Sequence, residues 1–234
     1  MARSDGPKSE SNVDRLYEAL RRMASDFAFK PDARINESAL ATQLNASRTP
    51  IREALNRLVA EGFLTFQSGR GFFCRSLSPE LVMDLYEARV AVEVEAVRLA
   101  SQRGSDDAIS ALMRELDEIA PDYTPEADPE SLLAMDERFH GQLCQLSGNA
   151  ELCRMLINLN DRIRYLRLID LRRLRETASS SSTMISAHRR ILDAVARRDP
   201  DEAAAQMRAH IERRREGATQ AVRDAYAQLY VPDL

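Results

Sequence analysis

Residues 45–55 read NASRTPIREAL, a tight turn followed by the first turns of a helix. Asn45 tolerates the left-handed backbone conformation that such a sharp corner requires. Ser47 is a favoured helix cap, and Pro50 is acceptable in the first turn because its missing N–H costs little there. The pattern predicts that this helix runs to about Ala60.

The flanking sequence supplies the other elements of a small domain. Apolar residues at helical spacing predict a first helix over Val13–Phe27 and a short second helix over Glu37–Leu44. Beyond the third helix, Phe63–Phe66 and Phe72–Cys74 are strand-like runs on either side of a Gly-containing turn. Two short helices joined by a tight turn and followed by a hairpin predict a winged helix-turn-helix.

Arginines lie where such a domain meets DNA. The second helix of the motif enters the major groove by its N-terminal residues, and Arg suits bidentate contact with guanine as well as phosphate binding. A single exposed Arg is more often an ordinary solvated charge, but this scaffold favours DNA contact. The predicted contacts are Ser47, Arg48, Thr49 and Arg52 on the helix, with Ser68, Gly69 and Arg70 in the hairpin turn.

The remaining sequence predicts a second, all-helical domain, so the fold class is mainly α. Six amphipathic helices are expected, over residues 79–102, 106–119, 129–147, 150–175, 183–198 and 200–229. We therefore expect a disordered arm over 1–11, a winged helix-turn-helix over 12–77 and a helical bundle over 78–234.

Charge is distributed unevenly between the two halves. Residues 1–77 carry 12 Lys and Arg against 9 Asp and Glu, whereas residues 78–234 carry 21 against 28. A basic front half suits a module that binds a polyanion, joined to one that does not. An excess of three charges is also small enough to arise by chance.

Cysteine usage and hydropathy indicate the compartment. The three cysteines form an odd set without a CxxC pair, which predicts unpaired thiols in a reducing environment. No apolar run approaches the roughly 20 residues of a membrane span, and residues 1–11 do not resemble a signal peptide. These features predict a cytoplasmic protein without a membrane partner.

The three histidines of the chain suggest a metal site in the helical half. Asp136 and His140 are four residues apart, so one helix face presents both, and His188 and His210 follow on later helices. One carboxylate oxygen and three imidazoles would suit zinc, nickel or another divalent transition metal. Spacing alone favours ordinary core or surface histidines, because Asp-x-x-x-His is common on helices.

The residues quoted so far carry a resemblance to a known family. ASRTPIREAL at 46–55, together with Leu40-Ala41, EGFL at 61–64 and GRGF at 69–72, closely resembles the gluconate-repressor (GntR) superfamily of regulators. The rear half is similar to the FadR branch, whose sensor is the FCD domain, through DLYEAR at 84–89, Glu93, DERFH at 136–140, AHRRIL at 187–192 and His210. Asn45 departs from the glycine usual in the family, but both residues reach the left-handed conformation.

The resemblance implies a ligand-controlled regulator. The positions of Asp136, His140, His188 and His210 match the metal ligands of metal-binding FCD proteins, and Arg89 matches an arginine that holds an effector carboxylate. Arg162 and Arg164 are further effector candidates on a later helix. The expected partners are a palindromic DNA operator, a small carboxylic acid and a second copy of the chain, with repression as the expected mode.

Other functions stay open at this point. Arg89 could instead form a surface ion pair with Glu93. A metal with open positions could serve a hydrolase, although the nearest extra carboxylate, Glu137, points off the ligand face and no nucleophile motif is present. A ligand-independent DNA-binding dimer with a dry apolar rear half is a third alternative. We expect no enzyme activity.

Overall fold

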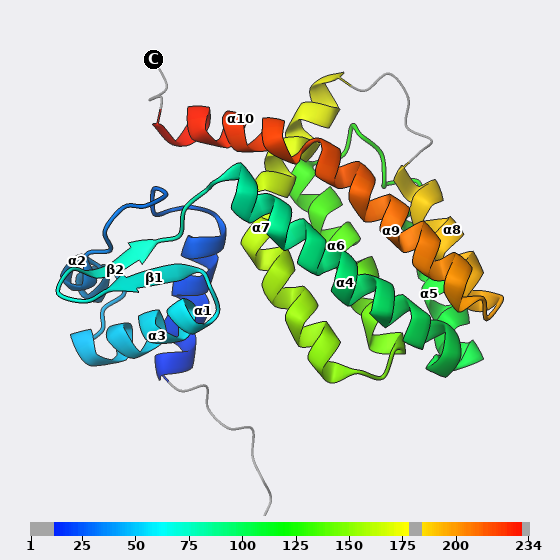
Figure 1. Cartoon of the computed structure of the whole chain (residues 1–234), viewed down its shortest axis with the longest axis horizontal. Coiled ribbons are helices and arrows are strands. Elements are labelled where there is room, and N and C mark those ends of the chain that lie inside the picture. Colours follow the sequence, from blue (N-terminus) through cyan, green and yellow to red (C-terminus); the bar gives the residue numbers. More distant parts are fainter. Residues whose placement is uncertain (1–11, 178–183, 231–234) are drawn as a thin grey trace, which may run out of the picture. The chain divides into compact units, whose positions relative to one another are not determined.

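The computed structural model describes residues 12–177 and 184–230 (Figure 1). The predicted disordered arm, residues 1–11, lies outside the described residues, as does Thr183, the first residue predicted for one helix. The chain divides into two compact units, Met1–Leu77 and Ser78–Leu234.

The first unit combines helices with a single antiparallel hairpin. Its described elements are α1 (Asn12–Ser25), α2 (Glu37–Gln43), α3 (Arg48–Ala60), β1 (Leu64–Gln67) and β2 (Gly71–Cys74). In the hairpin Leu64 pairs with Cys74 and Gln67 with Gly71. Helices α1 and α2 both contact α3, so they support the helix that is predicted to read DNA. This is the predicted winged helix-turn-helix.

Sharp corners and a leucine core fix this arrangement. Asn45 has the predicted left-handed conformation, with φ of 48°, and Gly69 in the hairpin turn has φ of 73°. Leu16 and Leu20 of α1 and Leu55 of α3 are fully buried. Because burying a leucine stabilises the fold by roughly 1.5–3 kcal/mol, the α1–α3 contact holds the unit together.

Two helix caps in this unit differ, which gives a stability prediction. The Asn36 side chain accepts hydrogen bonds from the Ser38 and Ala39 amides at 3.1 and 3.0 Å. Ser47 occupies the predicted cap position of α3 but makes no capping bond with its side chain, so the expectation of a Ser47 cap was wrong in that respect. Asn36→Ala should lower the free energy of unfolding by about 1 kcal/mol, whereas Ser47→Ala should cost less than about 0.5 kcal/mol. Urea unfolding of both whole-chain variants checks this, and equal losses would contradict it.

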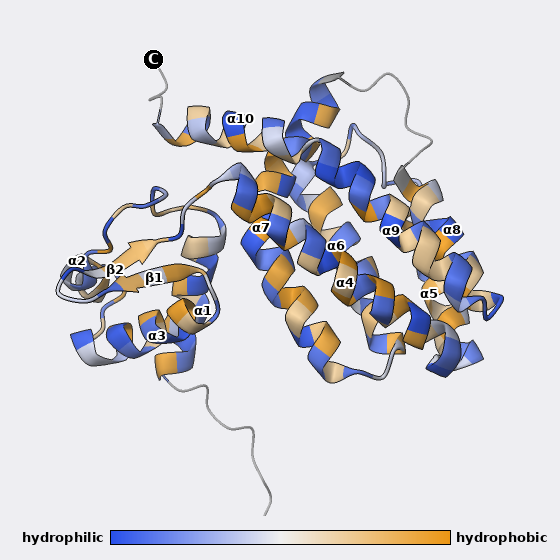
Figure 2. Ribbon diagram, in the orientation of Figure 1, coloured by the Kyte–Doolittle hydropathy of each residue, from blue (hydrophilic) through white to orange (hydrophobic). Residues whose placement is uncertain are grey.

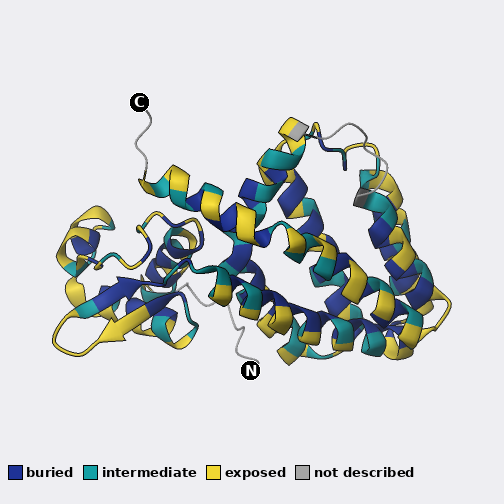
Figure 3. Cartoon of the chain, turned by 45° about the horizontal axis from the view of Figure 1, so that its top comes forward, coloured by how far each residue is buried: buried dark blue, intermediate teal, exposed yellow. Residues whose placement is uncertain are grey.

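The second unit is a bundle of helices. The described helices are α4 (Pro79–Arg103), α5 (Asp106–Ile119), α6 (Pro129–Leu146), α7 (Ala150–Thr177), α8 (Met184–Ala196), α9 (Pro200–Glu216) and α10 (Ala218–Tyr230). Helix α4 contacts α6, α7, α8, α9 and α10 and is therefore the central element. Figure 2 shows hydrophobic and hydrophilic residues alternating along these helices, and Figure 3 shows their buried faces. None of the described helices has an apolar stretch sufficient to cross a bilayer.

The end of the chain corrects one expectation. The sequence predicts a single helix over 200–229, but the structure divides it at Gly217 into α9 and α10, which change direction there (Figure 1). A Cβ at residue 217 would lie 2.8 Å from Asp170 Oδ1, so glycine permits the close approach to α7. Helix α10 then packs on α7. Periodicity alone did not reveal the break, because it continues through the glycine.

Candidate functional site

The seven predicted DNA contacts lie at two exposed places of the first unit: the start of α3 and the tip of the β1–β2 hairpin. The Arg52 side chain is 54% exposed, with its Nη1 3.9 Å from Glu37 Oε2. Arg70 donates a hydrogen bond to Gln67 Oε1 at 2.7 Å. Such exposed contacts contribute little energy, so both guanidinium groups can turn toward a nucleic acid at small cost.

A further arginine of α3, Arg57, contacts residues of α1. Arg57 Nη1 donates to Asp14 Oδ1 at 2.8 Å, and its guanidinium lies 3.8 Å from the centre of the Tyr17 ring. Both partners belong to α1. Arg57 therefore ties α3 to α1, which distinguishes it from Arg48 and Arg52.

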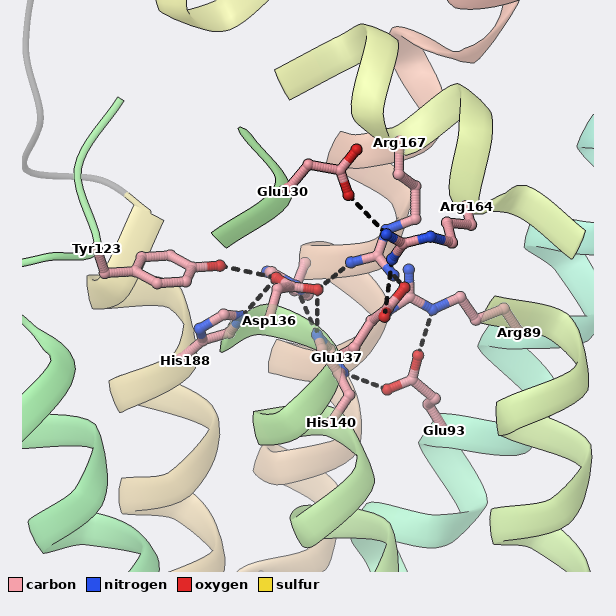
Figure 4. Close-up of polar contacts among 11 residues, drawn as sticks. Arg89, Glu93, Tyr123, Glu130, Asp136, Glu137, His140, Arg164, Arg167 and His188 are labelled. Atoms are coloured by element: carbon pink, nitrogen blue, oxygen red, sulfur yellow. Dashed lines mark hydrogen bonds and ion pairs between the residues drawn. The ribbon is translucent and has the colours of Figure 1, made fainter. Parts of the chain in front are cut away.

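In the second unit the four predicted metal ligands come together. Asp136 and His140 lie on α6, His188 on α8 and His210 on α9. All four side chains are buried, and their ligand atoms lie within 4.8 Å of one another. Figure 4 shows Asp136 and His140 of α6 pointing toward His188 of α8. The bundle thus gathers in one place residues up to 74 positions apart in the sequence.

The polar atoms of this cluster are better placed to coordinate a metal ion than to form hydrogen bonds with one another. His140 Nε2 and His210 Nε2 face each other at 3.2 Å. His188 Nε2 lies 3.3 Å from Asp136 Oδ1, yet neither ring nitrogen of His188 has a well-formed hydrogen bond within the described residues. Buried polar atoms nearly always have partners, so these nitrogens are available to a ligand. Three imidazoles and a carboxylate are a donor set that suits a divalent transition metal.

The protonation states suit metal binding as well. Burial lowers the pKa of His188, and burial together with the neighbouring histidines holds the pKa of His210 well below its ordinary value. Burial alone would raise the pKa of Asp136, but the nearby Arg167 and His140 hold it well below its usual range. The carboxylate is therefore ionised and these two imidazoles are neutral, which are the forms that bind metal.

A charged pair on the central helix α4 contacts His140. Glu93 on α4 contacts His140 Nδ1 with one oxygen, and its other oxygen accepts a hydrogen bond from Arg89 Nε at 2.5 Å. A carboxylate on one imidazole nitrogen fixes the ring and leaves the other nitrogen for a metal. Burial would raise the pKa of Glu93, but the charges and hydrogen bonds of Arg89 and His140 together outweigh burial and lower the pKa to about 2.

The guanidinium group of Arg89 is not fully hydrogen-bonded within the described residues. It does pair with Glu93, as one alternative proposed, but the pair is buried rather than on the surface, since each side chain is only 2% exposed. Arg89 Nη2 is buried and has no hydrogen-bond partner among the described residues. A buried, unsatisfied guanidinium nitrogen is costly unless a ligand satisfies it. A carboxylate would be such a ligand.

A small cavity borders Asp136. Its volume is about 20 Å³, enough for about one water molecule. Its polar lining comes from Tyr86, Tyr123, Asp136, Arg167, Asp170 and Arg214. None of the predicted effector residues Arg89, Arg162 and Arg164 is part of this lining. Arg164 instead forms ion pairs with Glu130 at 2.6 Å and Glu137 at 3.5 Å.

Sequence reasoning missed two partners of Asp136. Arg167 of α7 forms an ion pair with Asp136, and the Tyr123 hydroxyl donates to Asp136 Oδ1 at 2.8 Å. Arg167 follows the buried Leu159 and Ile163 by eight and four residues and so shares their helix face. That spacing could have identified it, whereas nothing in the local sequence marks Tyr123.

Comparisons with known proteins assign a family to each of the two units. Residues 12–74 match the gntR family of bacterial regulatory proteins, and residues 84–213 match the FCD domain. The chain is 41% identical over 208 residues to the Nta operon transcriptional regulator of Aminobacter aminovorans, covering 89% of this chain and 95% of the relative. It is 28% identical over 186 residues to the transcriptional repressor GlaR of Escherichia coli, covering 78% and 84% of the two chains.

A solved structure shows the same fold. Escherichia coli McbR/YncC superposes with a TM-score of 0.69 at 22% identity, covering 92% of this chain and 99% of that one. The matched families are those of transcriptional regulators, which are not enzymes. The chain therefore belongs to the gntR family of bacterial regulatory proteins and is a DNA-binding transcriptional regulator with an FCD domain.

Proposed function

We propose that this regulator is a repressor that binds a palindromic operator as a homodimer and responds to a small carboxylic acid bound beside a divalent metal ion. The observation that carries the proposal is the buried cluster of Asp136, His140, His188 and His210, with unsatisfied nitrogens on His188. Zinc is the first candidate because it accepts this donor set, and nickel is the second.

An acid is the proposed effector because cations surround the cluster. Arg89 Nη2 needs a hydrogen-bond acceptor, and a carboxylate can accept from a guanidinium while it also binds a metal. Arg162 and Arg164 stay predictions as additional contacts. The neighbouring cavity holds only about one water, so an acid entering there has to displace side chains.

That displacement offers a physical basis for control. An effector shifts a conformational equilibrium only when it binds one arrangement better than the other, and side chains that must move supply that difference. In a dimer the two winged helix-turn-helix domains must match the spacing of the two operator half-sites. A change in the distance between the two domains therefore changes operator affinity. Repression is the proposed mode because the similar GlaR is named a repressor.

The interior of the second unit favours a sensor over a purely structural dimerisation domain. Arg89, Glu93, Asp136 and His188 are all buried there. Burying ionised and polar groups is expensive unless they have partners or a ligand. A bundle that served only to dimerise would be more stable with apolar residues at such positions.

A thermal-shift screen of carboxylic acids, with and without a chelator, tests the proposal. At about 100 times its Kd, an acid that binds only the native state stabilises it by about 2.7 kcal/mol, which raises Tm by roughly 5–10 °C. The chelator should remove that increase. The stabilising acid should also weaken operator binding in a titration of the same preparation. Operator affinity that does not change with any stabilising acid would contradict ligand control.

A further inference from the structure

Two of the three cysteines, expected to be isolated thiols, lie against each other in the second unit. Cys144 is near the end of α6 and Cys153 is in the first turns of α7. Cys153 packs against the buried apolar cluster that Cys144 forms with Ala96 and Leu156. The short turn at residues 147–149 brings α7 back along α6 and so places the two sulfurs together.

The two thiols differ in exposure. Cys144 is 1% exposed, whereas Cys153 is only partly buried. Burial and the contact with Cys153 raise the pKa of the Cys144 thiol, so Cys144 stays protonated at neutral pH. An oxidant from solution reaches Cys153 first. Cys74, the third cysteine, is buried on β2 in the first unit.

We propose that Cys144 and Cys153 form a reversible thiol–disulfide site that hydroperoxides oxidise. This site depends on neither the metal nor the effector, so it goes beyond the proposed function. It would give the regulator a second chemical input within the same helical unit. The cross-link would join α6 to α7 at a point one helical turn beyond the ligand His140.

The chemistry proceeds in two steps. The Cys153 thiolate attacks one peroxide oxygen and the O–O bond breaks, which leaves a sulfenic acid on Cys153 and releases the other oxygen as water or an alcohol after it takes a proton. The Cys144 sulfur then attacks the Cys153 sulfur, the S–O bond breaks, and the departing hydroxide takes the Cys144 proton to leave as water. The two thiols lose two electrons, and the hydroperoxide is reduced by the same two.

The cysteine spacing allows a direct mapping experiment on the whole chain. Trypsin cleavage after Arg138 and Arg154 gives one peptide, residues 139–154, that contains both cysteines. A second cleavage after Glu151 separates it into two fragments, which remain joined only if the disulfide is present. After hydrogen peroxide treatment we expect joined fragments, separation by dithiothreitol, and a fall from three free thiols to one under denaturing conditions.

Variants keep the result interpretable. Cys144→Ala should leave Cys153 as a sulfenic acid that dimedone captures, and Cys153→Ser should show no peroxide-dependent thiol loss at Cys144. Cys74→Ser is the matched control and should still form the cross-link, falling from two thiols to none. Three thiols surviving peroxide in the parent chain would overturn the proposal. So would a disulfide found between two chains rather than within one, or equal thiol loss in Cys153→Ser.

Discussion

His188→Ala is expected to weaken metal binding by about 100-fold or more, since loss of outer partners of metal ligands alone costs 10–100-fold. His188 is suited to this test because its ring nitrogens have no well-formed hydrogen bonds among the described residues. Its non-ligand contacts are mainly to aromatic rings, with Phe139 stacked on it at 4.3 Å between centroids. The substitution therefore removes a ligand without breaking a hydrogen-bond network.

Metal content per chain, measured after dialysis against a weak chelator, is the first readout. The second is the change in Tm on adding a strong chelator, which should be large for the parent chain and absent for His188→Ala. Phe139→Leu is the control, because it disturbs the packing around His188 and leaves all four ligands in place. Parental metal content and affinity in His188→Ala would show that this cluster is not the metal site.

The first unit was predictable because its determinants are local. A turn residue, a cap position and an apolar stripe lie within a few residues of one another, and Asn45 adopts the conformation that its side chain permits. The exception is Ser47, whose side chain does not make the expected capping bond. Sequence identifies a residue that is able to cap, but the rotamer depends on the folded surroundings.

The metal cluster was only partly predictable from residues. Spacing paired Asp136 with His140, because both lie on one helix face. Bringing His188 and His210 to the same point depends on how α8 and α9 pack around α4, which no local pattern specifies. The family resemblance supplied that step, and the distances among the ligand atoms agree with it.

Contacts that depend on helix packing were harder still to predict. The i,i+4 spacing of Arg89 and Glu93 is equally consistent with a surface pair, and only packing shows that both are buried. Similarly, the spacing of Cys144 and Cys153 gives no CxxC motif, and their contact arises because the turn after α6 reverses the chain. Both the burial of the Arg89–Glu93 pair and the contact of Cys144 with Cys153 depend on which helix faces pack together, and the sequence does not specify that packing.

The double variant Arg48→Ala/Arg52→Ala should weaken operator binding by roughly 100-fold or more, because each bidentate arginine–base contact contributes about 1–3 kcal/mol. Both side chains are exposed at the start of α3 and are not needed for the core. Fluorescence anisotropy measures the loss on an operator that the parent chain selects from random duplexes. Arg57→Ala, which removes a charge from the same helix, should change affinity only a few-fold.

Lysine substitutions at the same two positions separate base reading from phosphate contact. Lysine keeps the charge but loses the planar fork that fits guanine. If Arg48 and Arg52 read bases, Arg48→Lys/Arg52→Lys should lose discrimination between operator and random DNA while keeping the salt dependence of the parent chain. If they bind phosphate, lysine should restore most of the affinity. Unchanged operator binding by the double alanine variant would mean that α3 is not the element that reads the operator.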